Sequence, residues 1–305
     1  MTAARVRAMD PYPSRGGAFR VLERKDPVVW GSTGPLGPDA LRELEARGVL
    51  FFPGFFDEDE TRALQQEAER RRAIADVASE QVVLEPGAEG AASIRSIFAV
   101  HRTPGPLADM PRHPRLLAIA EQILGGAAYI HQSRVNYKPG FDGKPFYWHS
   151  DFETWHQEDG MPRMRCFSCA VLLSETTEHN GPLMVFPGSH RVYVSCAGET
   201  PERNFERSLR DQVVGVPDRP TLERFARDFG IESPKGPPGS VILFDCNVMH
   251  GSNGNITPWP RHNLFYVFNA VDNALVAPYC GQAPRPEHIA SRRIEALTPC
   301  TPCSS

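Results

Sequence analysis

Hydrophobic residues recur at helical spacing in the first third of the chain. The segments 38–52 and 57–77 begin near Pro, Asp or Glu and place their apolar side chains along one face. From Ala128 onward the pattern changes to short runs rich in β-branched and aromatic residues, separated by Gly, Pro, Asn and Asp. We therefore predict outer helices around a mainly β fold, a sandwich or a barrel, with strands at 128–138, 165–174, 182–189, 239–245 and 261–271.

Two polar segments interrupt this pattern. Residues 198–239 are helix-prone, bounded by prolines and too long for a hairpin connection, so we expect an insertion or a lid. Residues 84–93, with the sequence LEPGAEGAAS, are rich in Gly and Ala and predict a mobile loop close to the site. Neither segment assigns a function by itself.

The composition fits one globular unit. The chain has 305 residues, a formal net charge of −4, 41% hydrophobic residues and 23% charged residues. No long linker, repeat or charge block divides it, so we expect one domain over residues 1–297 rather than two smaller ones. Residues 298–305 predict a disordered tail. Cys300 and Cys303 in this tail have the C-x-x-C spacing of redox and zinc sites, but they lack flanking elements, which favours the tail interpretation.

The charge pattern favours a small-molecule partner. Lys and Arg are dispersed and the net charge is near neutral, which argues against nucleic acid or an anionic membrane. The N-terminus lacks the apolar run of a secretory signal, and no apolar stretch reaches membrane-spanning length. The seven cysteines lie mostly in apolar contexts typical of buried thiols in a reducing compartment. These features predict a cytoplasmic protein.

One short stretch, residues 146–160, combines aromatic, histidine and carboxylate side chains in the sequence FYWHSDFETWHQEDG. His149 and Asp151 are two residues apart, and alternate residues of an extended segment project from one face, so both could bind one ion. An ordinary polar strand end has the same spacing. His250, in the turn after the run 239–245, supplies a third ligand. Two histidines and one carboxylate are the ligand set of non-haem Fe(II), and they leave positions open for a co-substrate and O2.

The co-substrate that suits such a centre is 2-oxoglutarate. Its keto acid end chelates iron, while its far carboxylate needs a fixed cation with forked donors. Arg261 follows His250 after a turn and stands at the start of the predicted strand 261–271. We expect the two residues to lie on adjacent strands. A surface arginine at a strand start is the alternative interpretation of Arg261.

Long motifs support a family resemblance. They include DPYPSR, DPVVW, IRSIFAVHR, QSRVNYKPGF, FYWHSDFETWHQEDGMPRMR, HNGPLMVFPGSH and PGSVILFDCNVMHGSNGNITPWPR. With these motifs the chain resembles the ectoine hydroxylases within the phytanoyl-CoA dioxygenase-like group of Fe(II)- and 2-oxoglutarate-dependent oxygenases, from residue 10 to beyond residue 280. The resemblance implies a double-stranded β-helix, a cupin-like jelly-roll core with helices around it.

The resemblance also implies the catalytic and co-substrate residues. His149, Asp151 and His250 would be the iron ligands. Arg261 would bind the distal carboxylate of 2-oxoglutarate. His190, in a motif of the wider group, would be structural. Further contacts to the co-substrate would come from Arg134, Asn136 and Ser252.

The substrate implied by the resemblance is ectoine, a small cyclic amidine with a carboxylate. Its delocalised cation suits aromatic faces, and Trp155 and Phe268 would flank the ring. Thr154 would line the pocket. Gln132 and Arg285 would receive the carboxylate. As alternatives, the two aromatic residues could belong to the core and Arg285 could be solvated.

Four further polar residues of the same stretch are not assigned to iron: Glu153, His156, Glu158 and Asp159. On an extended strand Glu153 would share the face of Asp151, but a fourth protein ligand would block a coordination position that the chemistry needs. We expect these residues to support the site or to meet solvent. His156 and Glu158, near the expected strand end, would orient Trp155 or be solvated.

The implied activity is hydroxylation of ectoine to 5-hydroxyectoine in compatible-solute (osmoprotectant) synthesis. O2 would be consumed and 2-oxoglutarate converted to succinate and CO2. The resemblance also implies a homodimer. Two alternatives stay open: an oxygenase of the same class acting on another small zwitterion, such as a proline-like amino acid, and a non-catalytic jelly-roll that binds a metal or a small ligand. A pure binding protein has no need for three open coordination positions, which disfavours the second alternative.

Overall fold

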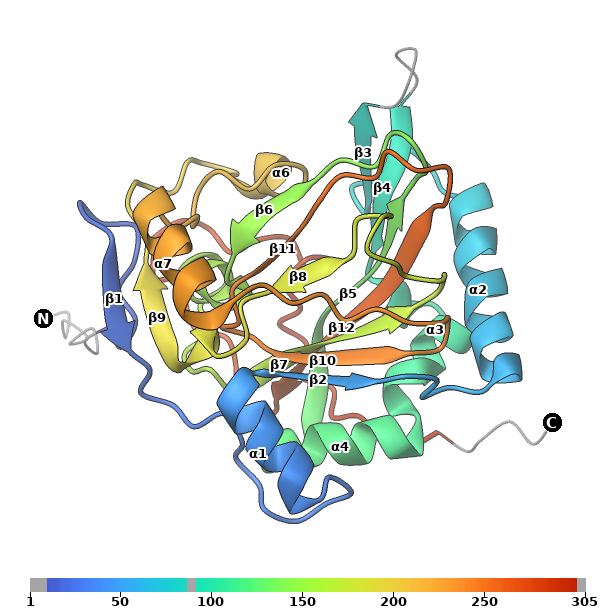
Figure 1. Cartoon of the computed structure of the whole chain (residues 1–305), viewed down its shortest axis with the longest axis horizontal. Coiled ribbons are helices and arrows are strands. Elements are labelled where there is room, and N and C mark those ends of the chain that lie inside the picture. The colour runs from blue at the N-terminus through green and yellow to red at the C-terminus, as the bar shows by residue number, and fades with distance from the viewer. Residues whose placement is uncertain (1–9, 87–91, 301–305) are drawn as a thin grey trace, which may run out of the picture.

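The fold is built on two sheets that face each other (Figure 1). The computed structural model describes residues 10–86 and 92–300. The larger sheet has seven strands in the order β2-β10-β7-β12-β5-β4-β3, and the smaller has three in the order β6-β11-β8. Neighbouring strands run antiparallel, which makes an open jelly-roll and confirms the predicted fold class. The strands of the two sheets are β2 (Val49–Phe52), β3 (Val82–Pro86), β4 (Ala92–Phe98), β5 (Ala128–Lys138), β6 (Phe146–His149), β7 (Cys166–Leu172), β8 (Leu183–Val185), β10 (Val241–Asp245), β11 (His250–Ser252) and β12 (Arg261–Ala270).

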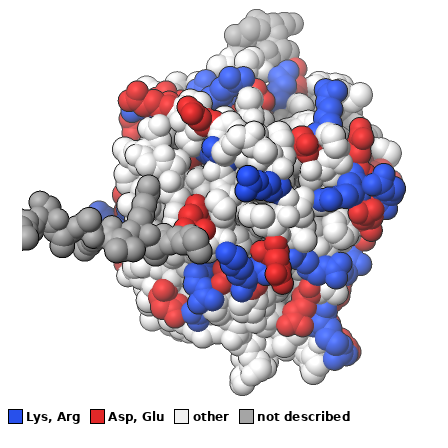
Figure 2. Space-filling model, turned by 90° about the vertical axis from the view of Figure 1, so that its left-hand side faces the viewer, with Lys and Arg blue, Asp and Glu red and all other residues white. Residues whose placement is uncertain are grey.

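Charged side chains of both signs are interspersed with uncharged areas on the face shown in Figure 2. On the coloured part of this face, Lys and Arg alternate with Asp and Glu. Exposed charges also pair over short sequence separations, as Arg203 does with Glu206, three residues later, at 2.6 Å. Each such pair adds little to stability. The mixture gives this face no large field of one sign.

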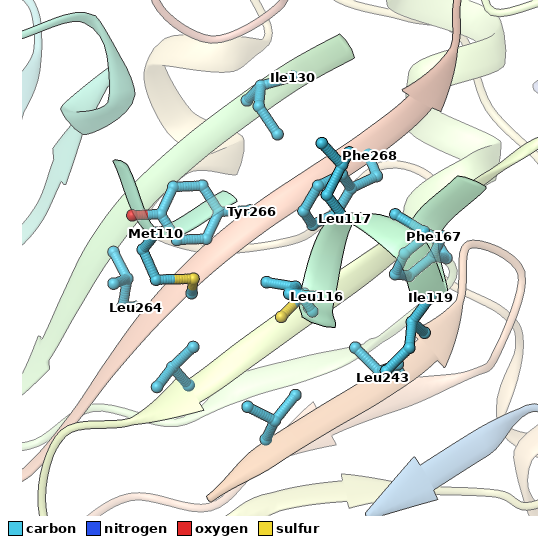
Figure 3. Close-up of a cluster of buried hydrophobic side chains, with 14 of the residues drawn as sticks. Met110, Leu116, Leu117, Ile119, Ile130, Phe167, Leu243, Leu264, Tyr266 and Phe268 are labelled. Carbon is cyan, nitrogen blue, oxygen red and sulfur yellow. The ribbon is translucent and has the colours of Figure 1, made fainter. Parts of the chain in front are cut away.

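The main hydrophobic core lies between the larger sheet and the helices that cover it. Side chains of β12 alternate, and Leu264, Tyr266 and Phe268 point into this core. There they meet Leu116 and Leu117 of helix α4 (Figure 3). The other face of β12 points into the space between the two sheets. The helices and helical turns of this side are α1 (Pro38–Arg47), α2 (Glu58–Ala73), η2 (Val100–Arg102), α3 (Pro106–Asp109), η3 (Met110–Arg112) and α4 (Pro114–Leu124).

Local signals fix the first two helices. In α2, the Asp57 side chain accepts from the Glu60 N–H while the Glu60 side chain accepts from the Asp57 N–H, a complete capping box. In α1, Gly48 ends the helix at φ 72°, a conformation that favours glycine. The segment 38–52 is therefore helical only to Arg47. Its last residues form β2, which extends the larger sheet beside β10.

In the segment 84–93, predicted as a mobile loop, the described residues 84–86 and 92–93 belong to strands. Strands β3 and β4 form an antiparallel hairpin at one end of the larger sheet. The tip of the predicted loop, residues 87–91, lies outside the described residues.

The predicted insertion 198–239 packs against the smaller sheet. It contains α6 (Phe205–Ser208) and α7 (Arg219–Phe229). Leu222 and Phe225 of α7 join Phe186 and Met249 in a separate hydrophobic cluster. The insertion therefore has its own apolar contact with the jelly-roll.

Segments at both ends of the chain lie along the jelly-roll. Near the N-terminus, β1 (Arg20–Glu23) pairs with β9 (Val192–Ser195), just after the turn η5 (Ser189–Arg191). Beyond β12 the chain runs back beside β5, where the Ser291 N–H donates to the His131 carbonyl. The predicted tail is placed as far as Cys300, whose N–H donates to the Arg112 carbonyl; Cys303 lies outside the described residues.

Candidate active site

Two histidines and one aspartate converge between the sheets. His149 ends β6 and stands opposite His250 of β11 in register. Asp151 begins the short helix α5 (Asp151–Thr154). Its carboxylate oxygens lie 3.6 Å from His149 Nε2 and 3.8 Å from His250 Nε2. One ligand atom from each residue lies within 4.8 Å of the others, so the three can share one metal ion.

Backbone and hydroxyl groups orient these three side chains. His149 Nδ1 donates to the Tyr147 carbonyl at 2.8 Å, and His250 Nδ1 donates to the Val248 carbonyl at 3.0 Å. Each imidazole therefore directs its Nε2 lone pair toward Asp151. Ser168 donates to the same carboxylate at 3.2 Å.

The charge states of His250 and Asp151 suit a divalent cation. Burial and the neighbouring His149 lower the pKa of His250 to about 4, so its imidazole is neutral at pH 7. Burial raises the pKa of Asp151, but His250 and His149 outweigh it and hold that pKa below its usual range. Two imidazole nitrogens and one carboxylate oxygen fit Fe(II) and leave its other positions open.

The backbone between His149 and Asp151 differs from the prediction. We expected one extended strand, but β6 ends at His149 and Ser150 leads into α5. The Phe152 N–H donates to the Cys246 carbonyl at 2.9 Å at this bend. The chain continues into a π-helical turn, η4 (Trp155–Asp159). Glu153 therefore does not share a strand face with Asp151.

The acidic residues of this segment are buried in ion pairs and are not solvated. Arg15 donates to both Glu153 oxygens from Nε at 3.0 Å and Nη2 at 2.9 Å, and to Glu158 from Nη1 at 2.6 Å. His156 Nε2 lies 2.7 Å from Asp10 Oδ1. We expected these residues to support the site or to meet solvent. Burial excludes the second alternative for Glu153, His156 and Glu158, because the N-terminal segment covers them.

A pocket opens beside the three metal-binding side chains. It lies between the two sheets and is closed on one side by α5 and η4. The site residues expected from the sequence that line it are His149, Asp151, His250, Arg261, Arg134, Asn136, Ser252, Gln132, Thr154, Trp155 and Arg285. The structure thus brings together every expected site residue except Phe268.

One end of the pocket is cationic. Arg261 is 5% exposed, and its Nε has no hydrogen-bond partner among the described atoms. Burial and Arg95 lower the pKa of Arg261 to about 10, so it stays charged at pH 7. Lys138 stands opposite Arg261 across β5 and β12 and donates to Ser252 Oγ at 3.0 Å. A carboxylate reaching this end would meet unpaired donors.

The expected strand arrangement of Arg261 and His250 was wrong. His250 lies on β11 of the smaller sheet, whereas Arg261 lies on β12 of the larger sheet. The two side chains approach the same pocket from facing sheets, because the turn between them crosses from one sheet to the other.

Phe268 does not line the pocket. Its side chain is fully buried on the helix-covered face of β12, stacked on Phe167 with ring centroids 5.2 Å apart (Figure 3). The aromatic residue of β12 in the pocket is Phe265, which shares a strand face with Arg261. Phe244, on β10, lies beside the metal site with its ring centroid 5.0 Å from that of His250.

A comparison with protein families places the chain in one family. The sequence model of the phytanoyl-CoA dioxygenase (PhyH) family matches residues 44–263. The chain belongs to the phytanoyl-CoA dioxygenase family. The resemblance seen in the motifs is confirmed, and the match includes all three metal-binding residues of this family member.

Relatives within this family are similar over nearly their whole length. An ectoine dioxygenase of Stutzerimonas stutzeri (strain A1501) is 52% identical over 287 residues, 93% of this chain and 94% of that protein. One of Streptomyces coelicolor is 44% identical over 296 residues, 96% of this chain and 98% of that protein.

Solved structures include EctD from S. alaskensis. The structure with bound Fe has a TM-score of 0.83 at 44% identity and covers 95% of this chain and 98% of that chain. The structure with 2-oxoglutarate and 5-hydroxyectoine has a TM-score of 0.81 at 45% identity, with 96% of each chain covered. These matches agree with the jelly-roll described above.

Three pocket residues of this phytanoyl-CoA dioxygenase family member come from the insertion 198–239, which the sequence did not assign to the site: Ser208, Leu209 and Gln212. Gln212 donates to Thr154 Oγ1 at 3.4 Å. The length of the insertion was the only signal, since no motif marks these residues.

Two further predictions concern regions away from the pocket. His190, expected to be structural, is buried beneath α1, where its Nε2 lies 3.1 Å from the Glu45 carbonyl. Among the helices in 10–86 and 92–300, none has the length and apolar character needed to cross a bilayer.

Proposed function

We propose that this protein hydroxylates ectoine to 5-hydroxyectoine with Fe(II), 2-oxoglutarate and O2. The observation that supports it best is one pocket with three parts: the triad His149, Asp151 and His250, the cationic end at Arg261, and the wall around Trp155. The reaction consumes one O2 and yields succinate and CO2 as well as the hydroxylated product.

The triad would hold the iron. Bound Fe(II), together with 2-oxoglutarate and O2, supplies the oxidising chemistry that decarboxylates the co-substrate and exchanges one substrate C–H for C–OH. The protein would contribute by holding the two imidazoles and the carboxylate in fixed orientations, because their second contacts prevent rotation. The rest of the pocket would be left for both substrates.

The cationic end would bind the distal carboxylate of 2-oxoglutarate. Arg261 offers forked donors, and Ser252 with Lys138 adds donors at the same end. Asn136 is fixed by Ser96, which donates to its Oδ1 at 2.8 Å. Arg134 lies between this end and the substrate side.

The substrate side would bind ectoine through its charge and its ring. Trp155 and Phe265 offer aromatic faces to the amidinium cation, and Thr154 lies beside Trp155. Arg285 and Gln132 would receive the carboxylate. Fixing this anion determines which C–H bond approaches the iron.

The insertion would exclude water from the reaction. Ser208, Leu209 and Gln212 border the pocket, and Gln212 contacts the substrate wall at Thr154. A closed, dry pocket strengthens the electrostatic contacts with the carboxylates of both substrates.

We also propose a setting for this activity. The chain would act as a single catalytic domain over residues 1–297, in the cytoplasm, as a homodimer, in osmoprotectant synthesis under osmotic stress. Light scattering coupled to size-exclusion chromatography tests the assembly, because a monomer of 33.9 kDa and its dimer differ twofold in mass.

The test of the reaction is incubation of the purified protein with Fe(II), 2-oxoglutarate, O2 and ectoine. Mass spectrometry should show a product heavier than ectoine by one oxygen, in equal amount to succinate. Succinate without hydroxylated ectoine would refute the substrate but keep the oxygenase class, and a parallel reaction with proline then tests the nearest alternative. No succinate with any substrate would leave only the non-catalytic alternative.

A further inference from the structure

Asp159 lies just behind the substrate side of the pocket with both carboxylate oxygens bound. Arg285 donates to it from Nε and from Nη2, each at 2.6 Å. His131 Nε2 lies 3.1 Å from Asp159 Oδ2. The side chains of His131 and Asp159 have no exposed surface, and that of Arg285 is 5% exposed. A buried cluster of this kind fixes its members tightly.

The charge of Asp159 determines the roles of its two partners. Burial raises its pKa, but Arg285 and His131 outweigh this and hold the pKa below its usual range. Asp159 is therefore ionised and can only accept hydrogen bonds. It follows that His131 donates its Nε2–H, and that the guanidinium of Arg285 stays flat against the carboxylate.

This contact determines how Arg285 faces the pocket. Asp159 occupies the Nε and Nη2 edge of the guanidinium. Nη1 is not used by Asp159, and Arg285 lines the pocket that holds the metal-binding triad. The two bonds to Asp159 therefore fix the guanidinium of Arg285, and its remaining N–H groups keep one orientation at the pocket.

The carboxylate of Asp159 is also linked to Trp155, because His131 contacts both residues. Val267 of β12 pairs with Gln132 and Phe268 with Ile130, so His131 is the extra residue of a β-bulge. Its ring meets Trp155 edge to face, with centroids 5.5 Å apart and planes at 71°. The position of Trp155 thus depends on a residue that Asp159 holds.

The cluster joins two parts of the chain. Asp159 lies inside residues 44–263, which match the family, whereas Arg285 lies beyond them. Arg292, also beyond them, donates from Nη2 to the Asp159 carbonyl at 2.6 Å. Asp159 thereby attaches the segment after β12 to the helical turn beside the triad.

We propose that Asp159 is a positioning residue for the substrate. It holds Arg285 directly and Trp155 through His131, and so fixes the groups that receive the carboxylate and the ring. Asp159 does not itself line the pocket. This inference rests on the proposed function, in which Arg285 binds the ectoine carboxylate.

The variant Asp159→Asn tests the proposal. An amide keeps the size of the side chain but places an NH2 donor against the donors of Arg285 or His131. We expect the KM for ectoine to rise about 10- to 100-fold, because a misplaced Arg285 no longer fixes the substrate. The KM for 2-oxoglutarate and the iron content should not change. If this variant does not fold, Asp159→Glu, which keeps the charge and displaces the fork, should raise the same KM.

Asp245→Asn is the matched control. Asp245 accepts two bonds of 2.8 Å from the Arg24 guanidinium, also with side chains at most 5% exposed, but it does not line the pocket. We expect lower thermal stability and an unchanged KM for ectoine. An equal rise of this KM in both variants would overturn the proposal, because loss of any buried ion pair would then weaken ectoine binding.

A double-mutant cycle separates positioning from a purely structural role. If Asp159 acts mainly through Arg285, then Asp159→Asn should raise the KM for ectoine much less in the Arg285→Ala background than in the wild type. Only the smaller effect through His131 and Trp155 should remain in that background. Effects that multiply would overturn the proposal. Normal ectoine turnover with an unchanged KM in Asp159→Asn would reject only this inference, whereas a wild-type protein inactive on ectoine would reject the proposed function together with it.

Discussion

Lys138 and Arg261 stand opposite each other on β5 and β12 at the cationic end of the pocket. Lys138 donates to Ser252 Oγ and to the Asn253 carbonyl, both uncharged acceptors. Burial, with Arg261 and Arg95 nearby, lowers the pKa of Lys138 to about 6. At pH 8 this end therefore contains the charge of Arg261 and a neutral amine.

We predict that 2-oxoglutarate binding protonates Lys138. A carboxylate placed between Lys138 and Arg261 favours the charged amine and raises its pKa. Binding at pH 8 should take up close to one proton, and affinity should fall as the pH rises from about 6 toward the raised pKa. Anaerobic calorimetry of the Fe(II)-loaded protein in buffers of different ionisation enthalpy measures this uptake.

The variant Lys138→Met provides the comparison for the proton count. It keeps an unbranched side chain that is one atom shorter, and it removes the titrating group. Its 2-oxoglutarate binding should be weaker at pH 6. At pH 8 its proton uptake should be smaller than that of the wild type by nearly one. Equal uptake in both proteins would assign the proton to another group.

The metal site was largely predictable from the sequence, but its backbone was not. Residue types and order made His149, Asp151 and His250 candidates, the family resemblance implied the same three residues, and the structure brings them together. The bend after His149 was missed because a spacing of two suits both a strand and a strand-to-helix junction. The contact that distinguishes them, from Phe152 to the Cys246 carbonyl, joins residues far apart in the chain.

The error at Phe268 could have been avoided from the sequence. Side chains of a strand alternate, so a pocket-facing Arg261 already places Phe265 on its own face and Phe268 on the other. The buried pairs of Glu153 and Glu158 had no such signal. Their partner, Arg15, lies 138 residues before Glu153 in the sequence. Only the fold shows that the two side chains are in contact.

We predict that Asp151→Ala abolishes iron binding, whereas Glu153→Gln does not. Asp151 supplies the only carboxylate of the triad, while Glu153 faces Arg15. Iron retained after gel filtration of protein loaded anaerobically measures the difference. Glu153→Gln should retain about one iron per chain despite lower stability, because it loses a buried ion pair. Loss of iron in both variants at equal thermal stability would contradict the assignment of ligands.

The Arg15 cluster should make stability depend on pH. Burial raises the pKa of Glu153, but Arg15 outweighs it, so this pKa lies below 4.5, its value in an unfolded chain. The unfolded state then binds more protons as the pH falls below 4.5, and the stabilisation present above that pH is lost on acidification. Denaturant unfolding at several pH values should show this decline in the wild type.

Arg15→Met should lower the free energy of unfolding at pH 7 by about 3–5 kcal/mol, because two buried carboxylates lose their cation. Its stability should also fall less steeply below pH 4.5 than that of the wild type, since Glu153 no longer has a lowered pKa. Arg203→Met, which breaks an exposed pair with Glu206, should change stability by less than about 1 kcal/mol. A similar small loss in both variants would contradict the role of Arg15.

Two phenylalanines of β12 should respond differently to the same substitution. Phe265 lines the pocket, and its ring lies 4.8 Å from the Arg134 guanidinium carbon, whereas Phe268 is packed under α4. Phe265→Leu should raise the KM for ectoine about 2- to 30-fold, the range of a lost cation–π contact of about 0.5–2 kcal/mol. Phe268→Leu should leave that KM unchanged and cost about 1 kcal/mol of stability, because a smaller side chain remains in the core. Steady-state kinetics and denaturant unfolding of both variants distinguish the two faces of the strand. A KM for ectoine that rises only in Phe268→Leu would show that Phe268, as first expected from the sequence, contacts the substrate ring.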